Sequence, residues 1–337
     1  MTSTNIGEPN LKAQKICPLC GSLDFAPTED IVNLSEVLNR WEKQAGVQFR
    51  QSVWDEYTQV KSLESTLYHC HHCDFGIFQP PIMGSNDFYE DITETNYYIS
   101  DKWEHYQAIK DLKNRQCISV FDYGCGSGNF LRLLKDKYPD SQSVGYEYAA
   151  KVADLANSHG LKVFTGKFPE SVMNLKEGTN GLFDAITCFQ VLEHVADPLS
   201  LLKQLSGMLK KGGFLAIGVP DEAGPIRTFS KELTCVPPHH VSRWTKKTFE
   251  TSFPFESLSV VRMANEPLPN YLWPFYLPVM WGQSIWPAYL WKIFHPLQQK
   301  DRQDQVTWFI EKMNKLKVRW LPGVPGHTIY ILLQKTV

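Results

Sequence analysis

The feature that most constrains the fold is a regular alternation of strand-like and helix-like segments from Gln116 to Asp221. Short apolar runs such as "CISVFDYG" and "FDAITCFQV" are separated by amphipathic stretches such as "NFLRLLKDKY" and "DPLSLLKQLSGMLKKGG". Strands joined by helices pair in parallel, because each crossover helix returns the chain to the same edge of the sheet. The pattern therefore predicts an α/β domain with a mostly parallel sheet. Gly160 and the pair Gly212 and Gly213 are expected at helix C-caps.

A glycine-rich turn follows the first of these strands in "VFDYGCGSGNFL". The glycines stand at 124, 126 and 128, whereas a dinucleotide turn would carry G-x-G-x-x-G and position 129 is Asn. The spacing therefore disfavours a nicotinamide dinucleotide. Glu147, at the end of the next strand in "VGYEY", is placed to accept hydrogen bonds from ribose hydroxyls. Together the turn and this carboxylate predict a ligand that contains adenosine.

The fourth strand ends in "FQVLEHVADP", which puts Gln190, Glu193 and His194 at the carboxyl edge of the sheet, where open α/β sheets bind ligands. The run "FDYGCGSGNFL", "VGYEY" and "FDAITCFQVLEHVADPLSLLKQLSGMLKKGGFLAIGVPD", in this order, resembles the class I S-adenosylmethionine-dependent methyltransferases over Gln116 to Asp221. The resemblance implies S-adenosyl-L-methionine as the cofactor. It also implies a Rossmann-like sheet of seven strands, mostly parallel with an antiparallel last strand.

The same resemblance implies a set of cofactor contacts. The glycine turn would border the methionine end, Glu147 the ribose, Tyr148 the adenine, and the segment from Gln190 to Leu192 the sulfonium. Lys167 stands where the family often has an acidic residue near the adenine amine. The implied cofactor-binding residues are Asp122, Tyr123, Gly124, Gly126, Gly128, Glu147, Tyr148, Gln190, Val191, Leu192, Tyr98 and Trp103.

Four of the eight cysteines form two C-x-x-C pairs, Cys17 with Cys20 and Cys70 with Cys73. A two-residue spacer lets one tight turn present both sulfurs to a tetrahedral metal, and two such turns supply four ligands. Because four ligands leave no open position, we predict a structural Zn²⁺ site. The neighbouring His69, His71 and His72 are alternative ligands. The segments "SEVLNRWEKQAG" and "VWDEYTQVKSL" predict a helical insertion between the pairs.

An N-terminal zinc-binding lobe resembles that of methyltransferases from sugar and natural-product pathways. The chain then divides into a zinc-ribbon-like lobe with a helical insertion (1–80), an aromatic helical lid or linker (81–115), a methyltransferase core (116–265), a helical aromatic-rich insertion (266–326) and the last core strand (327–337). Ser100 is the expected N-cap of a helix through Lys113. We expect Tyr97, Tyr98 and Trp103 to cover the cofactor, with ordinary core packing as the alternative.

The composition and sequence argue against nucleic acid as a partner and against a membrane-spanning segment. A formal net charge of -2 and no broad basic surface argue against nucleic acid, as does the absence of an Asn- or Asp-Pro-Pro-aromatic motif after the fourth strand. The first twenty residues lack the apolar core of a signal peptide, which predicts a cytoplasmic protein. The uncharged segment 271–291 is interrupted by three prolines, so we do not expect it to span a membrane. Contact with a lipid-linked acceptor at a membrane interface stays open.

Three histidines are candidates for a general base. His239 and His240 lie in "TCVPPHHVSRWT" just after the fifth strand, and His194 lies after the fourth. Methyl transfer needs a base only when the acceptor must lose a proton, as a hydroxyl or an acidic carbon must. We therefore predict O- or C-methylation of a small sugar or natural-product intermediate. A non-catalytic adenosylmethionine-binding scaffold is the main alternative, and the sequence leaves the acceptor and the oligomeric state open.

Overall fold

The computed structural model describes residues 16–58, 64–93, 102–168, 183–225, 227, 231–255, 257–274, 276–277 and 302–336. Within these ranges a seven-stranded sheet has the order β10-β11-β8-β7-β4-β5-β6. Its strands are β4 (Ser119–Tyr123), β5 (Gln142–Tyr146), β6 (Val163–Phe164), β7 (Phe183–Phe189), β8 (Leu209–Pro220), β10 (Leu258–Pro269) and β11 (Trp320–Lys335). β4 to β8 pair in parallel, and β11 runs antiparallel to both of its neighbours. The predicted Rossmann-like sheet is confirmed.

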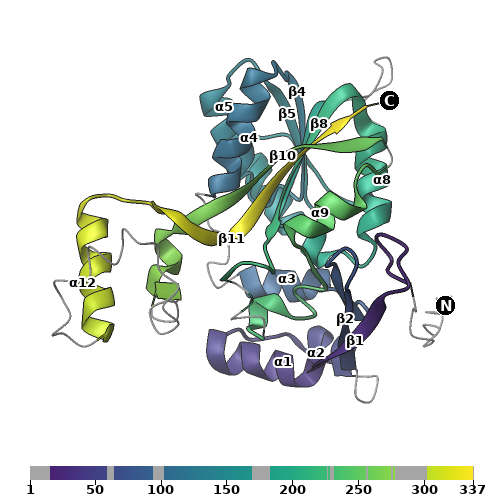
Figure 1. The fold of residues 1–337 in the computed structure, drawn as a ribbon, viewed down its shortest axis with the longest axis vertical. Coiled ribbons are helices and arrows are strands. Elements are labelled where there is room, and N and C mark those ends of the chain that lie inside the picture. The colour runs from purple at the N-terminus through teal and green to yellow at the C-terminus, as the bar shows by residue number, and fades with distance from the viewer. Residues whose placement is uncertain are drawn as a thin grey trace.

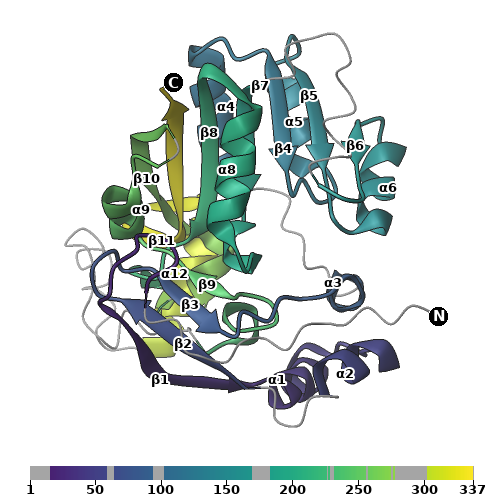
Figure 2. The ribbon, with the colours of Figure 1, turned by 90° about the vertical axis from the view of Figure 1, so that its right-hand side faces the viewer.

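Helices cover both faces of this sheet (Figures 1 and 2). Alternate residues of a strand point to opposite faces, so Val120 packs with one set of helices and Phe121 with the other. The Val120 side carries α4 (Trp103–Asn114), α5 (Asn129–Lys137) and α6 (Ala150–Ser158). The Phe121 side carries α8 (Pro198–Met208) and α9 (Lys246–Ser252). The core therefore lies in two layers, one on each side of the sheet.

Local signals set most helix ends. Asp197 caps α8 by accepting a hydrogen bond from Ser200 N at 3.0 Å, and Thr245 opens α9 with a capping box. Two predicted ends were wrong. α4 begins at Trp103 with Lys102 as its N-cap, where Ser100 was expected. α8 ends at Met208, so Gly212 and Gly213 both lie inside β8 and neither is a helix C-cap. The buried Leu209 pairs there with Phe183 of β7.

The N-terminal lobe contains a second sheet of order β1-β2-β3-β9 among the described residues. Its strands are β1 (Phe25–Asn33), β2 (Glu64–Cys70), β3 (Gly76–Gln79) and β9 (Ser242–Arg243). The predicted helical insertion is confirmed as α1 (Leu34–Arg40), a π-helical turn η1 (Trp41–Ala45) and α2 (Gln51–Thr58), with α3 (Asn86–Thr93) following β3. β9 begins two residues after His240, so the lobe's sheet ends on a strand from the segment that carries His239 and His240.

The strands β10 and β11 extend beyond the large sheet as a two-stranded arm, which Figure 1 shows on the left. The arm leads to the short helix η5 (Asn270–Leu272) and to α12 (Arg302–Lys315), and it has a small core of its own that includes Leu268, Trp273 and Phe309. β11 begins at Trp320, seven residues before the predicted start at His327, because its pairing with β10 continues along the arm.

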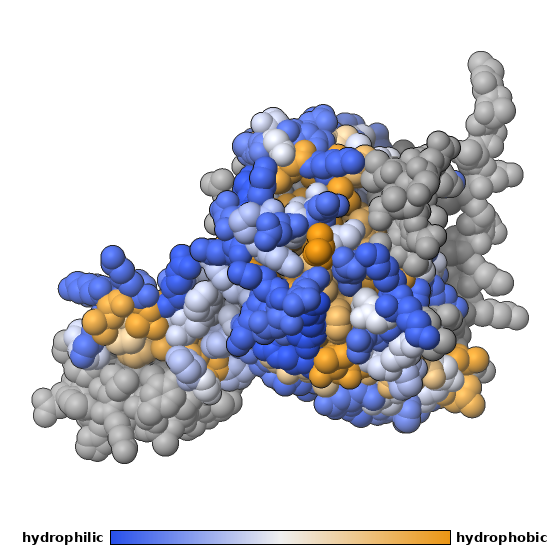
Figure 3. Space-filling view, turned by 90° about the horizontal axis from the view of Figure 1, so that it is seen from above, coloured by the Kyte–Doolittle hydropathy of each residue, from blue (hydrophilic) through white to orange (hydrophobic). Residues whose placement is uncertain are grey.

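The described residues on one face of the molecule are largely hydrophilic (Figure 3). Seen from above, polar and charged residues cover much of the visible face, with apolar residues between them (Figure 3). Among the described residues, no helix is both long and apolar enough to cross a membrane. Most of the uncharged segment 271–291 lies outside the described residues.

Candidate functional site

A cavity of about 390 Å³ lies at the carboxyl edge of the large sheet. The loops after β4, β7 and β8 meet there, and ligands of open α/β sheets bind at this edge. The first turn of α4 and the base of the arm complete the wall. The lining includes Lys102, Glu104, His105, Asp122, Gly124, Gly126, Gln190, Glu193, Thr234, His239, His240, Tyr271 and His327.

The glycine turn after β4 has the backbone that its sequence predicts. Gly124 has φ +74°, and a Cβ there would lie 2.4 Å from Cγ2 of Val191. Glu147 holds the turn, because its Oε2 accepts a hydrogen bond from Gly126 N at 2.8 Å and its Oε1 accepts one from Ala149 N at 3.0 Å. Burial raises the pKa of Glu147. The end of β5 therefore fixes the turn that borders the cavity.

Asp122 lies beneath the turn with only 2% of its surface exposed. Its Oδ1 accepts a hydrogen bond from Thr187 Oγ1 at 2.6 Å. Burial raises the pKa of Asp122 to about 7, because a charged carboxylate is poorly solvated there. This carboxyl group can therefore gain or lose a proton near neutral pH.

Gln190 ends β7 in a left-handed conformation with φ +55°. Its backbone N donates a hydrogen bond to Gly218 O at 2.7 Å, and its side-chain Nε2 donates one to Glu104 Oε1 at 3.1 Å. Glu104 is 2% exposed in the first turn of α4. Our sequence reasoning missed Glu104, although a carboxylate beside aromatic residues at a helix start could have drawn attention to it.

Three histidines form a cluster at one side of the cavity. His194 ends the short helix η2 (Leu192–His194), and His239 and His240 precede β9. Their ring centroids lie 4.5 to 4.7 Å apart. His194 Nδ1 donates to His239 O at 2.6 Å, and His239 Nδ1 donates to Thr234 O at 2.9 Å. Because a carbonyl oxygen only accepts, both rings carry their proton on Nδ1 and keep the lone pair on Nε2.

Burial lowers the pKa of His194 to about 4, and it lowers the pKa values of His239 and His240 well below their ordinary value. The cluster is therefore uncharged at neutral pH. Glu193, beside it, is 1% exposed, and its Oε1 lies 3.9 Å from His194 Nε2. Among the described residues, neither carboxylate oxygen of Glu193 has a hydrogen-bond partner. Burial raises the pKa of Glu193 to about 8.

Several of the implied cofactor contacts lie away from the cavity lining. Trp103 packs edge-to-face on Tyr330 with centroids 6.4 Å apart, and Tyr123 stacks on Tyr146 at 5.3 Å. Tyr148 is 55% exposed at the surface. Val191 packs under Gly124, Leu192 is buried in the core, and Gly128 begins α5. Tyr97 and Tyr98 lie outside the described residues.

Tyr271 and His327 also line the cavity, from the base of the arm, with ring centroids 6.4 Å apart. They lie far apart in the sequence and carry no motif, so sequence reasoning had no signal for their joint position. Thr234, from the loop that leads to the histidine pair, closes the same side.

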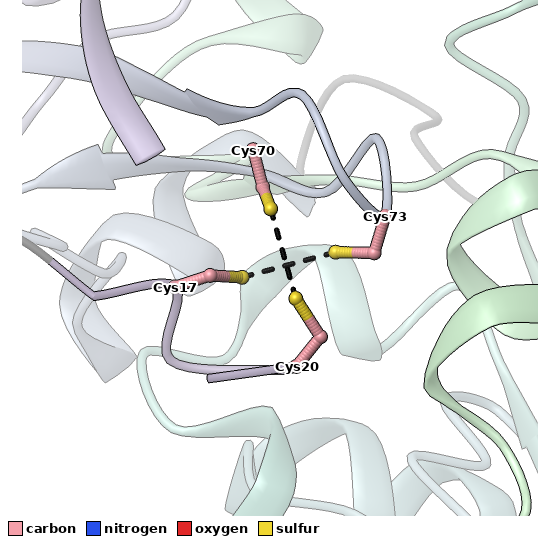
Figure 4. A group of neighbouring side chains, drawn as sticks. All are labelled: Cys17, Cys20, Cys70 and Cys73. Atoms are coloured by element: carbon pink, nitrogen blue, oxygen red, sulfur yellow. Dashed lines mark hydrogen bonds between the residues drawn. The ribbon is translucent and has the colours of Figure 1, made fainter. Parts of the chain in front are cut away.

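The four cysteines of the two C-x-x-C pairs converge in the lobe (Figure 4). Cys17 and Cys73 have sulfurs 3.8 Å apart, and Cys20 and Cys70 have sulfurs 3.6 Å apart. A tetrahedral zinc with bonds of about 2.3 Å requires sulfurs about 3.8 Å apart, so the set fits this ion. His69 lies outside the set, with its Nε2 3.0 Å from Asp74 Oδ1.

The comparisons with known proteins bear on the large sheet. Residues 96–253 match a family model described as a methyltransferase domain. The chain contains a class I S-adenosylmethionine-dependent methyltransferase domain. The sequence motifs that resemble this family lie inside the matched range.

Curated relatives match a shorter stretch of the chain. The ubiquinone biosynthesis O-methyltransferase of Xanthomonas oryzae pv. oryzae (strain PXO99A) is 35% identical over 100 residues, which cover 28% of this chain and 40% of the relative. The enzyme of the same description from Albidiferax ferrireducens is 35% identical over 101 residues, covering 28% and 38%. The chain thus spans about 40% of the length of the curated relatives it matches.

Solved structures are similar at lower identity. The plantazolicin methyltransferase BamL, in complex with a triazolic desmethylPZN analog and SAH, is 14% identical with a TM-score of 0.45, and the match covers 75% of this chain and 90% of that chain. The magnesium protoporphyrin IX methyltransferase ChlM from Synechocystis PCC 6803, with bound SAH, is 10% identical with a TM-score of 0.42, covering 68% and 81%.

Proposed function

We propose that the chain transfers a methyl group from S-adenosyl-L-methionine to a small-molecule acceptor. The observation that carries the proposal is the meeting of two features in one cavity: the glycine turn held by Glu147, and the pair His239 and His240 from the histidine cluster. The turn would hold the methionine end of the cofactor. Glu147 would accept hydrogen bonds from the ribose, and Gln190, which lines the cavity after β7, would lie beside the sulfonium.

Methyl transfer is an in-line displacement in which the bond from carbon to sulfur breaks as the bond to the acceptor forms. The protein therefore contributes alignment and exclusion of water. The acceptor that suits this cavity is a hydroxyl or an acidic carbon, because the uncharged ring of His239, His240 or His194 can activate it by taking its proton. The relatives named as O-methyltransferases support oxygen as the methylated atom. A sugar or another natural-product intermediate is the proposed substrate class.

The proposed lobe metal is a structural Zn²⁺ held by Cys17, Cys20, Cys70 and Cys73. Its four sulfurs would fill a tetrahedral shell and leave no position for a substrate. A zinc ion would join the segment before β1 to the turn between β2 and β3. We expect Cys20→Ser to lower the zinc content by about one ion per chain, whereas Cys117→Ser, at a buried cysteine outside the cluster, keeps it.

The experiment that tests the function combines binding and turnover. Calorimetry with adenosylmethionine and adenosylhomocysteine measures cofactor affinity, and a panel of sugar, phenol and β-dicarbonyl acceptors with labelled adenosylmethionine measures transfer. Binding with transfer to at least one acceptor is expected. Binding without transfer to any acceptor would favour a scaffold, and absence of binding would overturn the proposal.

A further inference from the structure

We propose that His194, His239, His240 and Glu193 form a site for a divalent metal cation on the acceptor side of the cavity. The inference rests on the proposed function for its chemical consequence, but the site itself stands on the closeness of the three histidines and on the burial of Glu193 beside His194. It is separate from the four-cysteine cluster of the lobe.

The three histidines already approach one another closely enough to share an ion. Each offers a ring nitrogen, and these nitrogens all lie within 4.8 Å of one another. A metal with bonds of about 2.0–2.1 Å to nitrogen needs tetrahedral ligands about 3.4 Å apart, so nitrogens at the 4.8 Å limit would draw closer together when an ion binds.

The hydrogen bonds of the cluster prepare it for a metal. Histidine ligands commonly donate their second ring N–H to a backbone carbonyl, which fixes the tautomer and aims the other nitrogen at the ion. His194 and His239 both do this through Nδ1, toward His239 O and Thr234 O.

Backbone hydrogen bonds also join the two segments that supply the ligands. Val241 N donates to Glu193 O at 2.7 Å, and Ser242 Oγ donates to Leu192 O at 3.0 Å. The ligands therefore lie on two segments whose spacing is fixed before an ion binds.

The burial of Glu193 is an independent observation that points to a bound cation. A buried carboxylate without a hydrogen-bond partner is costly, and buried acidic groups are normally paired or bound to a metal. The side chain of Glu193 is 1% exposed, both oxygens lack a partner among the described residues, and Oε1 lies 3.9 Å from His194 Nε2. A cation between the two would bind both. Three imidazoles and one carboxylate suit zinc, iron, cobalt or nickel better than magnesium or calcium.

The site faces the acceptor, because Glu193, His239 and His240 line the cavity. An acceptor hydroxyl bound to the ion as a fifth ligand, beside the three imidazoles and the carboxylate, would have a lowered pKa and release its proton to water. Its oxygen would then take the methyl group as the carbon–sulfur bond breaks and neutral adenosylhomocysteine leaves. In this form the histidines act on the acceptor through the cation instead of taking its proton themselves.

The test is a cobalt titration of the full chain after a mild chelator has removed weakly held metal. Co²⁺ bound by cysteine thiolates shows strong charge-transfer absorption, whereas Co²⁺ on nitrogen and oxygen shows only weaker d–d bands. We expect about one equivalent with the second signature. His239→Ala should abolish it, and Glu193→Gln should weaken it by about tenfold to a hundredfold. His159→Ala, at an exposed histidine that directly follows α6, should leave it unchanged.

One further measurement and one further variant separate loss of the metal site from loss of the fold. Adenosylhomocysteine affinity reports whether each variant is folded, and His240→Gln replaces His239→Ala if that variant has lost it. A wild-type chain that binds no Co²⁺ on nitrogen and oxygen, or a His159→Ala effect as large as that of His239→Ala, would overturn the site. Full methyl transfer by chain freed of this metal would overturn its role and leave the proposed function standing. Metal binding without any methyl transfer would leave the metal site standing and overturn the proposed function.

Discussion

The carboxylate of Glu147 accepts a hydrogen bond from the backbone N–H of Gly126 at 2.8 Å, which ties the end of β5 to the glycine turn after β4. The second oxygen accepts from Ala149 N at 3.0 Å, at the start of α6. One side chain therefore joins the two segments that border the adenosine side of the proposed cofactor site. Hydrogen bonds to a charged acceptor are stronger than those between neutral groups, so this junction is stiff.

Glu147→Gln should weaken adenosylhomocysteine binding by about tenfold or more, because the amide has one acceptor oxygen in place of two and lacks the charge. Calorimetry measures the change. Glu250→Gln makes the same substitution at an exposed position on α9 and should bind as the wild type does. Equal affinity of the two variants would show that Glu147 has no part in the cofactor site.

Gly124→Ala should abolish cofactor binding and destabilise the domain. Both Gly124 and Gly160 have positive φ, +74° and +76°, so Ala is strained at either position. A Cβ at Gly124 would also lie 2.4 Å from Val191 Cγ2, whereas at Gly160 it meets nothing within 4 Å. Gly160→Ala should therefore cost only about 1 kcal/mol of the free energy of unfolding.

The double variant Gly124→Ala with Val191→Ala removes the clash and should recover part of the stability that Gly124→Ala loses. Urea unfolding of the wild type, Gly124→Ala, Gly160→Ala and the double variant compares their free energies of unfolding. If the double variant were no more stable than Gly124→Ala, contact with Val191 would not be the cause.

The stability of the fold should depend on the protonation of Asp122. Burial raises its pKa in the folded chain to about 7, above the value of about 3.9 in an unfolded chain. The folded state therefore holds this proton more tightly, and the stability due to Asp122 is present at low pH and is lost as pH rises from about 4 to about 7.

Asp122→Asn removes this dependence. Relative to the wild type, the variant should gain about 1 kcal/mol in the free energy of unfolding per pH unit between pH 5 and 7, and the gain should level off above that range. Urea unfolding at several pH values measures it, with Asp136→Asn, exposed on α5, as the control for loss of a carboxylate. A difference that stays constant with pH would contradict the raised pKa.

Arg243→Gln should destabilise the junction between the lobe and the large sheet. Arg243 Nη1 lies 2.8 Å from Glu222 Oε1, with the two side chains only 11% and 17% exposed. Its backbone pairs with Gly76 of β3. Loss of one partner leaves the other charge buried, which costs about 3–5 kcal/mol.

Lys210→Gln is the matched control, because it breaks an ion pair with Asp184 in which the lysine is 49% exposed. Exposed pairs contribute about 0–1 kcal/mol, so its cost should be small. The double variant Arg243→Gln with Glu222→Gln should be more stable than Arg243→Gln alone. Equal free energies of unfolding for Arg243→Gln and Lys210→Gln would contradict the buried character of the pair.

The amino-acid sequence by itself determined the type of fold and the position of the glycine turn. Both depend on local patterns: the alternation from Gln116 to Asp221 sets the parallel sheet, and glycine is the residue that adopts positive φ without strain. The sequence also predicted the cysteine cluster, because each C-x-x-C spacing is set within a single turn. Local reasoning misplaced the ends of α4 and α8, where packing of Trp103 and Leu209 outweighs the capping signals.

Only the tertiary structure decided what surrounds the cavity. His194 and His239 are 45 residues apart, and nothing in either segment indicates that their rings touch. The sequence places Glu193 at the carboxyl edge of the sheet, but only the structure shows that its side chain is buried and has no hydrogen-bond partner among the described residues. Such contacts join segments that are distant in the sequence, so they follow from the packing of β7, β9 and the lobe against one another. The local pattern sets each element, and the shared core sets which side chains meet.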